Sequence, residues 1–451
     1  MRRILVFFMC AVGLIQSTTA QTGGADIRQW TTAMGTRVLF LAANEIPMVD
    51  LSVDIDAGSR WDPRDRSGIA SMTAAMLSKG IRASGAMPAM GETQISEALA
   101  ELAVQRGGAV TLDRASITLR SLSDQDVRER AVRLLSRIMF EPAFDREILQ
   151  REKQRMVAGL RESMTQPQSI ATKALWRAMY AAHPYGQQAT PESVDPITAD
   201  DLSQFHQRYW VPSRMRVTIV GALTEAQARA LVDQLFAAAP AVNGPSLSPA
   251  RVHPGSLETS PKAMRQAIAH PASQSHIWMG LPGIARDDPD FFSLTVGNYI
   301  LGGGGFVSRL TEEIREKRGL SYSVFSAFQP LAQPGPFMMS LQTQRAKAPE
   351  ALEVMEQTLR KFLQDGPTEK ELRAAKQNLI GGFALRLDTN RKLLDNLAQI
   401  NFYDMPLDYL QTWTAKVDRV TTADIRRAMN RVIKPEHLSV VVVAGPEGFQ
   451  P

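Results

Sequence analysis

The stretch VDPITADDLSQFHQRYWVPSRMRVTIVG, residues 194–221, is echoed near the end of the chain by VDRVTTADIRRAMNRVIKPEHLSVVVVAG, residues 417–445. Each copy has a threonine that can cap a helix, a helical pattern with Leu or Ile, a proline (Pro212 or Pro435), and an apolar strand that ends in glycine. Self-similarity of this kind indicates that the chain contains two copies of one structural unit.

The repeat extends upstream of both copies. Residues 127–163 and residues 351–387 each show a helix, a turn that contains proline, and a longer helix. Residues 48–57, 116–121 and 216–221 alternate apolar and polar side chains, as strands do. We therefore predict an α+β fold of two duplicated domains, each an antiparallel sheet with helices packed on one side.

The boundary between the domains is marked by composition. Residues 237–263 carry Pro, Gly and Ser every few positions without sustained periodicity, which predicts a linker. The N-terminal domain is then expected over residues 25–236 and the C-terminal domain over residues 264–451. A chain of 451 residues is long enough for more than one hydrophobic core.

The first twenty residues have the pattern of a signal peptide. Arg2 and Arg3 precede the apolar run 4–15, and small residues end at Ala20. This run is shorter than the roughly 20 apolar residues that span a bilayer, and no later stretch approaches that length. We predict cleavage after residue 20, no stable membrane insertion, and a periplasmic or secreted location; an uncleaved anchor is the alternative.

Charge and cysteine content exclude several classes of function. Removing residues 1–20 takes away two arginines and lowers the formal net charge from +5 to +3. Basic and acidic residues alternate, as in DVRERAVRLL, so they indicate solvated helix faces rather than nucleic-acid binding. The only cysteine, Cys10, lies in the signal peptide, so the mature chain can form neither a disulfide nor a zinc–thiolate site.

The stretch SGIASMTAAMLSKG, residues 67–80, has the apolar spacing of a helix but no side chain that can hold a metal. It follows a predicted strand, the segment AGSR and an acidic loop. This order resembles the entry to the zinc helix of pitrilysin/insulinase-type metallopeptidases, the inverted zincins, whose motif is H-x-x-E-H. The resemblance places Ser71 at the first histidine, Ala74 at the catalytic glutamate and Ala75 at the second histidine.

The resemblance covers about residues 30–446. Residues 144–162, FDREILQREKQRMVAGLRE, are similar to the helix that supplies the third zinc ligand in the family, with Glu152 at its upstream glutamate and Gly159 at the ligand position. The resemblance therefore implies a degenerate site that binds no metal.

The spacing of the histidines also excludes a zinc-binding pair on one helix, because none of the six is three or four residues from another. Only His183 and His206 remain a pair that folding could bring together, and His183, beside a proline, is more simply a capping or loop residue.

The second half of the sequence contains residues that could bind a substrate. Residues 300–328 contain a run of four glycines (302–305), a predicted helix with Arg315 that Gly319 ends, and a predicted strand with Tyr322. No Lys-Ser/Thr follows the glycines, which favours a flexible loop over a phosphate cradle. The segment EIREKRGLSY is similar to the Arg/Tyr pair that, in the inverted zincins, holds substrate near a zinc of the opposite domain. Read alone, Arg315 is a surface ion-pair residue and Tyr322 a strand residue.

The resemblance leads to one functional hypothesis and two alternatives. Some bacterial members of the family divide the zinc motif and the Arg/Tyr pair between two subunits. We therefore expect a non-zinc-binding subunit whose zinc-bearing homologous partner cleaves peptide or unfolded protein, with Arg315 and Tyr322 stabilising the oxyanion. The alternatives are a non-catalytic peptide-binding or scaffold subunit of the same fold, and a self-sufficient peptidase with unorthodox ligands.

Overall fold

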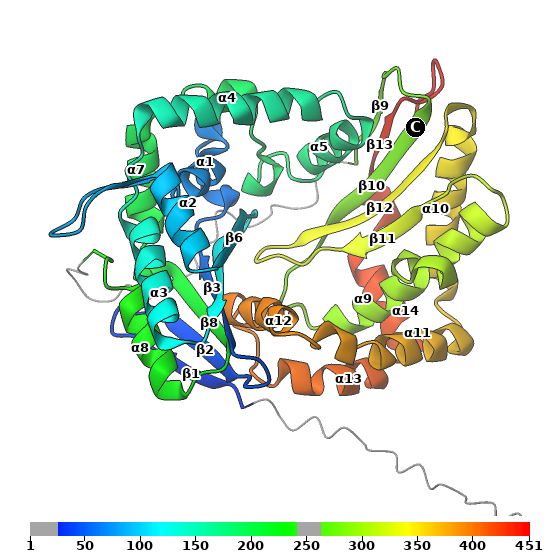
Figure 1. Cartoon of the computed structure of the whole chain (residues 1–451). Helices are drawn as coiled ribbons and strands as arrows, with labels where there is room; N and C mark the ends of the chain where they lie inside the picture. The colour runs from blue at the N-terminus through cyan, green and yellow to red at the C-terminus, as the bar shows by residue number, and fades with distance from the viewer. Residues whose placement is uncertain (1–25, 241–262) are drawn as a thin grey trace, which may run out of the picture.

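The computed structural model describes residues 26–240 and 263–451, which form two halves that each contain one large sheet (Figure 1). The predicted signal peptide and most of the predicted linker lie outside the described residues. The N-terminal sheet consists of β1 (Arg28–Thr31), β2 (Arg37–Ala42), β3 (Met48–Ile55), β6 (Gln105–Val110), β7 (Ala115–Leu122) and β8 (Met215–Gly221). The C-terminal sheet consists of β9 (Arg265–Ile268), β10 (Gln274–Ile284), β11 (Val324–Phe328), β12 (Gly335–Gln344) and β13 (Ser439–Val443).

The two sheets share one topology, which confirms the duplication. The N-terminal order is β1-β2-β8-β3-β7-β6, and the C-terminal order read in the same direction is β9-β13-β10-β12-β11. The central strands β3 and β10 each pair antiparallel with both of their neighbours. Both sheets are antiparallel, as predicted, except at one pair in each half. There β2 lies parallel to β8, and β9 to β13, because long crossovers return the chain in the same direction.

The quoted repeat forms the same unit in both halves, a helix followed by a strand. It comprises α7 (Ala199–Tyr209) with β8 and α14 (Thr422–Val432) with β13. Thr198 and Asp201 exchange hydrogen bonds of 3.1 and 2.9 Å at the start of α7. Thr421 and Asp424 do the same at α14, both at 3.1 Å. The threonine caps predicted from sequence are therefore present, each completed by an aspartate three residues later.

Most helices of each half cover one face of its own sheet, and one helix of each half, α5 or α12, packs on the other sheet. The N-terminal helices are α1 (Ile69–Met76), α2 (Glu92–Glu101), α3 (Gln125–Phe140), α4 (Arg146–Ser163), α5 (Pro167–Met179), α6 (Pro191–Val194), α7 and α8 (Glu225–Leu235), and the short strands β4 (Gly80–Ile81) and β5 (Met90–Gly91) form a separate pair. The C-terminal helices are α9 (Phe291–Asn298), α10 (Ala348–Asp365), α11 (Glu369–Gly381), α12 (Asn390–Phe402), α13 (Tyr409–Arg419) and α14.

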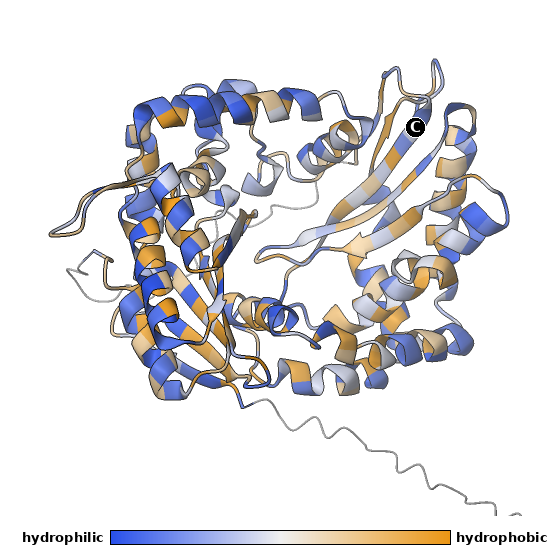
Figure 2. Cartoon of the chain, viewed as in Figure 1, coloured by the Kyte–Doolittle hydropathy of each residue, from blue (hydrophilic) through white to orange (hydrophobic). Residues whose placement is uncertain are grey.

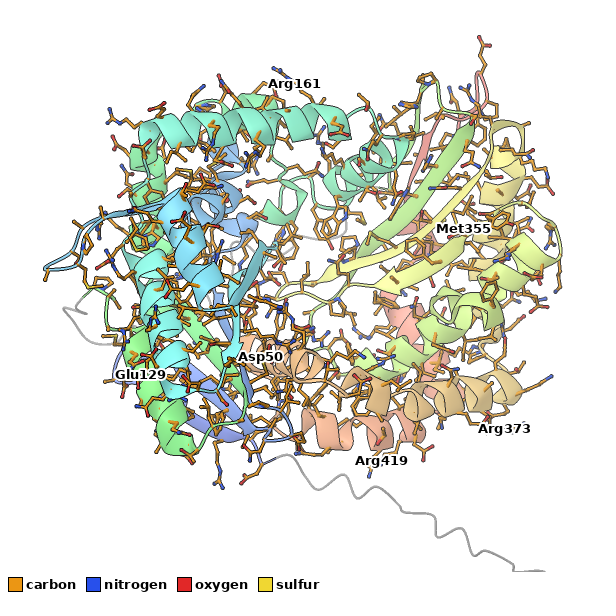
Figure 3. The ribbon with its side chains drawn as sticks, in the orientation of Figure 1. Asp50, Glu129, Arg161, Met355, Arg373 and Arg419 are labelled. Carbon is orange, nitrogen blue, oxygen red and sulfur yellow. The ribbon has the colours of Figure 1, made fainter. Side chains whose placement is uncertain are left out.

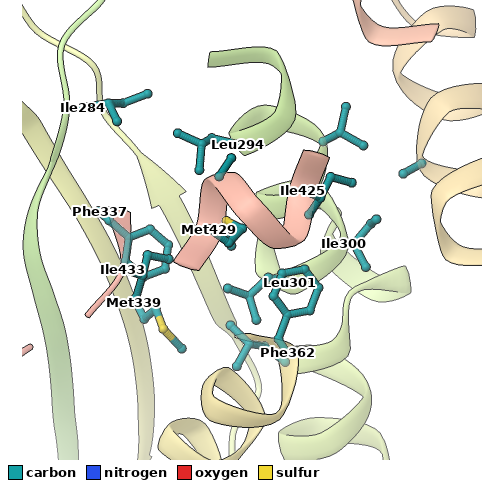
Figure 4. Close-up of a cluster of buried hydrophobic side chains, with 14 of the residues drawn as sticks. Ile284, Leu294, Ile300, Leu301, Phe337, Met339, Phe362, Ile425, Met429 and Ile433 are labelled. Atoms are coloured by element: carbon teal, nitrogen blue, oxygen red, sulfur yellow. The ribbon is translucent and has the colours of Figure 1, made fainter. Parts of the chain in front are cut away.

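The C-terminal core lies between the sheet and these helices. Phe337 and Met339 of β12 belong to the same buried cluster as Ile425 and Met429 of α14 (Figure 4). Apolar residues are frequent along the strands, while polar residues alternate with apolar ones along the outer helices (Figure 2). No helix in the described part of the chain is long and apolar enough to cross a membrane.

The second face of each sheet is covered by a helix from the other half (Figure 1). Helix α5 packs on β10 and β13, where Leu175 shares a buried cluster with Trp278 and Val441. Helix α12 packs on β8 and β3, where Leu397 shares a cluster with Leu39. The prediction of helices on one side was therefore incomplete. Strands such as β13, SVVVV, are buried along their whole length because both of their faces are covered.

A buried carboxylate joins the two halves. Asp113, in the turn between β6 and β7, is fully buried and accepts hydrogen bonds from Arg60 Nη1 at 3.1 Å and Tyr185 OH at 2.6 Å in its own half. It also accepts hydrogen bonds from the Ala332 amide at 2.8 Å and from Tyr403 OH at 3.0 Å in the other half. One aspartate thus satisfies four donors drawn from both halves.

Replacing this carboxylate should destabilise the whole molecule. We expect Asp113→Ala to lower the free energy of unfolding by about 3 kcal/mol or more, because it leaves the buried Arg60 guanidinium, the buried Tyr185 phenol and the half-buried Tyr403 phenol short of an acceptor. Glu101→Ala, which breaks the exposed pair with Arg130, should cost less than about 1 kcal/mol. Urea denaturation followed by circular dichroism measures both. Equal effects of the two substitutions would contradict the role given to Asp113.

Candidate functional site

Helix α1 is held at its N-terminus by Asp62. The Asp62 carboxylate accepts hydrogen bonds from the Gly68 amide at 2.7 Å and the Ala70 amide at 3.1 Å, two amides at the start of the helix. Ile69, Met72 and Met76 are buried in the N-terminal core. The helix predicted over residues 67–80 is therefore a core element whose apolar face is required for packing.

The opposite face of α1 borders a cavity of about 400 Å³. Ser71, Ala74 and Ala75 line this cavity together with strand β6. They contribute one hydroxyl and two methyl groups, whereas zinc takes three or four nitrogen, sulfur or carboxylate ligands at about 2.0–2.3 Å. These residues do not fit a zinc ion. Across residues 26–240 and 263–451, no group of three or more His, Cys, Asp or Glu side chains is placed to hold a metal.

The two positions assigned on α4 lie apart from the cavity lining. A Cβ built on Gly159 would have no heavy atom within 4 Å among the described residues, so this position faces open space. The Glu152 carboxylate is buried and pairs with Lys79 at 3.4 Å and with Arg151 and Arg155 at 3.0 Å. Glu152 therefore serves to join α4 to the segment that follows α1.

The sequence reasoning missed Arg106, a residue of β6 that lines the same cavity. Its Nη2 donates to Ser78 Oγ at 2.9 Å, and no carboxylate of the described residues pairs with it. Burial lowers the pKa of the Arg106 guanidinium, since the surroundings do not compensate for the lost solvation. The cavity wall thus carries an uncompensated positive charge; the only sequence signal was an arginine immediately before two glycines.

Arg315 and Tyr322 are brought together in the C-terminal half. Arg315 Nη1 lies 3.4 Å from the carbonyl oxygen of Tyr322, and the guanidinium lies 5.3 Å from the centre of the Tyr322 ring. Arg315 lies on a π-helical turn, Thr311–Glu316. Tyr322 lies in the bend before β11, so its predicted place in a strand was wrong; the chain there has not yet joined the sheet.

Apolar side chains surround this pair on the surface. Tyr322 is 90% exposed, and Phe306 and Val307 are each 73% exposed. The Arg315 guanidinium also lies 4.8 Å from the centre of the Phe306 ring, within the range of a cation–π contact. Together, Phe306, Val307, Arg315 and Tyr322 form what we call the Arg/Tyr surface. Exposed aromatic groups in such a cluster are typical of an interaction site.

Three of the four glycines beside this surface, Gly302, Gly303 and Gly304, are tightly packed, whereas a Cβ on Gly305 would meet no heavy atom of the described residues within 4 Å. A Cβ on Gly302 would lie 2.5 Å from Ser326 Oγ, and one on Gly303 would lie 2.6 Å from Asn298 Nδ2. A Cβ on Gly304 would lie 2.6 Å from the backbone oxygen of Tyr299. At Gly302, Gly303 and Gly304 the absence of a side chain permits close approach of the turn to its neighbours.

The two histidines considered as a pair have separate structural roles. His183 Nδ1 accepts a hydrogen bond from the Tyr185 amide at 3.2 Å, which confirms its interpretation as a capping residue. His206 Nε2 lies 2.7 Å from the Met139 carbonyl oxygen, and its ring stacks on Trp210. Burial lowers the pKa of His206 to about 4, so its ring is neutral near pH 7.

Comparisons with known proteins point to one family. Residues 37–191 match the model described as "Insulinase (Peptidase family M16)", and residues 196–379 match "Peptidase M16 inactive domain". The crystal structure of a peptidase M16 inactive domain from Pseudomonas fluorescens is 34% identical, with a TM-score of 0.86 over 94% of this chain and 99% of that one. The "Non-peptidase homolog YmxG" of Helicobacter pylori is 25% identical over 90% of this chain and 91% of its own.

More distant matches agree on the fold. The "Uncharacterized zinc protease YmxG" of Bacillus subtilis is 25% identical over 82% of this chain and 87% of its own. The periplasmic protease PqqL of Escherichia coli is 15% identical, with a TM-score of 0.76 over 99% of this chain and 49% of that one.

The Asp62 contact predicts a pH effect on stability. Burial raises the pKa of Asp62 to about 7, because desolvation outweighs the two backbone hydrogen bonds. An unfolded aspartate titrates near pH 3.9, so the contribution of Asp62 to stability is present below about pH 4 and is lost as the pH rises through about 7. We expect Asp62→Asn, which keeps an acceptor oxygen but cannot ionise, to gain stability relative to the wild type between pH 4.5 and 8.

The measurement is the urea midpoint of both proteins at each pH. Burial also raises the pKa of Asp54 to about 6, but that contribution is common to both proteins and cancels. A difference between wild type and variant that stays constant from pH 4.5 to 8 would show that Asp62 does not titrate in this range.

Proposed function

The chain belongs to the M16 (insulinase) family of peptidases, and from that premise we propose that it is the non-zinc-binding subunit of a heteromeric peptide-cleaving metallopeptidase. Its zinc would be held by a homologous partner chain. The observation that carries the proposal is the separation of two sites. The cavity beside α1 offers a hydroxyl and two methyl groups instead of zinc ligands, while Arg315 and Tyr322 lie together on the surface of the other half.

The chemistry of the Arg/Tyr surface suits an assisting role. A guanidinium and a phenol both donate hydrogen bonds, and neither ordinarily changes its charge near pH 7. Directed at the carbonyl oxygen of a bound peptide, they would stabilise the negative charge that develops on this oxygen in the transition state. The partner's zinc would supply the activated water. The exposure of Tyr322 is consistent with a group that is completed by another molecule.

A second candidate function is supported by one relative. The Helicobacter pylori protein is named a non-peptidase homologue, and it matches most of this chain. On this alternative, the present chain binds peptide or supports an assembly without changing any rate. We place either role in the periplasm or outside the cell, on the basis of the predicted signal peptide at residues 1–20.

Reconstitution distinguishes the two roles. The purified chain would be mixed with the zinc-bearing M16 homologue of the same organism and an unstructured fluorogenic peptide. We expect the mixture to cleave faster than the homologue alone, and Arg315→Ala or Tyr322→Phe to reduce that gain about a hundredfold, the usual cost of one oxyanion donor. Arg373→Ala, on the outer side of α11 (Figure 3), is the control and should leave the rate unchanged.

Three results are informative. A complex that forms without any change in cleavage rate would favour the scaffold role. Full stimulation by both variants would remove Arg315 and Tyr322 from catalysis. Stoichiometric zinc together with cleavage by the chain alone would overturn both roles.

A further inference from the structure

Unlike Arg114 and Arg120, Arg106 has no carboxylate partner among the described residues. On the adjacent strand β7, Arg120 binds both oxygens of Asp50 at 2.8 and 3.0 Å. Arg114, just before β7, pairs with Asp54 at 3.1 Å. Arg106 is half-buried like them, yet among the described residues its side chain has only the Ser78 hydroxyl as a partner. A guanidinium that has lost solvent without gaining a counterion has unused capacity to bind an anion.

The cavity beside Arg106 has room for such an anion. Its volume of about 400 Å³ falls within the roughly 300–1,000 Å³ of ligand pockets. Ala74 and Ala75 present only methyl groups to it, and Gly107 and Gly108 of β6 add no side chain to its wall. Ser71 contributes a hydroxyl that can donate a hydrogen bond. Ser116 of β7 also lines the cavity, with its hydroxyl donated to the Ala109 carbonyl oxygen at 3.2 Å. The lining therefore combines one cation, the hydroxyls of Ser71 and Ser116, and free space, with no acidic side chain.

The positive charge of Arg106 is unfavourable for a zinc ion, which the family resemblance would place beside α1. A zinc site attracts a divalent cation through carboxylate and imidazole ligands, whereas a guanidinium repels a cation and binds a carboxylate through two parallel N–H donors. We propose that the cavity between α1 and β6 is a carboxylate-binding site, in which Arg106 holds a carboxylate of a peptide. The carboxylate belongs either to the peptide's C-terminus or to an acidic side chain.

The position of β6 favours a peptide as the source of this carboxylate. β6 is the outermost strand of its sheet, so the backbone groups on its free side have no partner strand within that sheet. An extended peptide can add to such an edge through main-chain hydrogen bonds. β6 also lies on the side of the N-terminal sheet that faces the C-terminal half (Figure 1). A peptide along β6 would therefore pass directly beside the Arg106 cavity.

The site is tested by binding to the full chain alone, so its outcome is independent of any zinc-bearing partner. Three unlabelled, N-acetylated hexapeptides of Ala and Ser would be titrated by isothermal titration calorimetry: one with a free C-terminal carboxylate, one amidated, and one amidated with a single internal Glu. We expect at least one carboxylate-bearing peptide to bind about tenfold or more tightly than the amidated peptide without Glu, as a charge-assisted pair provides. Which of the two binds identifies the source of the carboxylate.

Variants of the chain test whether Arg106 causes the preference for a carboxylate. Arg106→Gln should abolish the preference for a carboxylate, Arg106→Lys should keep part of it, and Arg373→Gln, which removes the same charge from α11, should keep all of it. Ala75→Glu places a competing carboxylate from an exposed position in the cavity lining and should also abolish the preference, even if Arg106→Gln does not fold. Equal affinity for the three peptides, or an unchanged preference in Arg106→Gln or Ala75→Glu, would overturn the proposal.

Discussion

The buried carboxylate of Asp113 fixes how the two halves of this molecule are arranged. A charge with no solvent must have its lone pairs satisfied, and here the four donors are Arg60 and Tyr185 of one half and the Ala332 amide and Tyr403 of the other. The exchange of α5 and α12 adds apolar burial to this polar contact. Without the other half, each sheet would leave one apolar face uncovered, so the two halves are expected to fold as one cooperative unit.

Helix α1 has a structural role that does not depend on metal binding. Its buried face, with Met72 and Met76, is held by the N-terminal core and by the Asp62 contact at its start. The face that lines the cavity carries small side chains and contributes little to packing. Selection for stability therefore constrains only one side of the helix. The other side can carry the small side chains of Ser71, Ala74 and Ala75 without unfolding the domain.

The two polar sites of the chain have different physical characters. Arg106 is half-buried, has no carboxylate partner and borders a cavity, which suits selective binding of an anion within this chain. Arg315 and Tyr322 lie on an open surface beside exposed Phe306 and Val307, which suits contact with a second macromolecule. At Arg106 the cavity already reduces contact with solvent, which strengthens an ion pair. The Arg/Tyr surface loses its solvent only when another molecule covers it.

Local sequence patterns determined the duplication, the threonine caps and the absence of zinc ligands at Ser71, Ala74 and Ala75, because periodicity, capping and ligand chemistry depend on residues close together in the chain. The continuous apolar run of β13 also carried the signal of a strand buried on both faces. Only the tertiary structure decided the exchange of α5 and α12, the contacts of Asp113 with Ala332 and Tyr403, which are 219 and 290 positions away, and the isolation of Arg106 beside the cavity. These features arise from contacts between distant segments, and no local spacing specifies which segments meet.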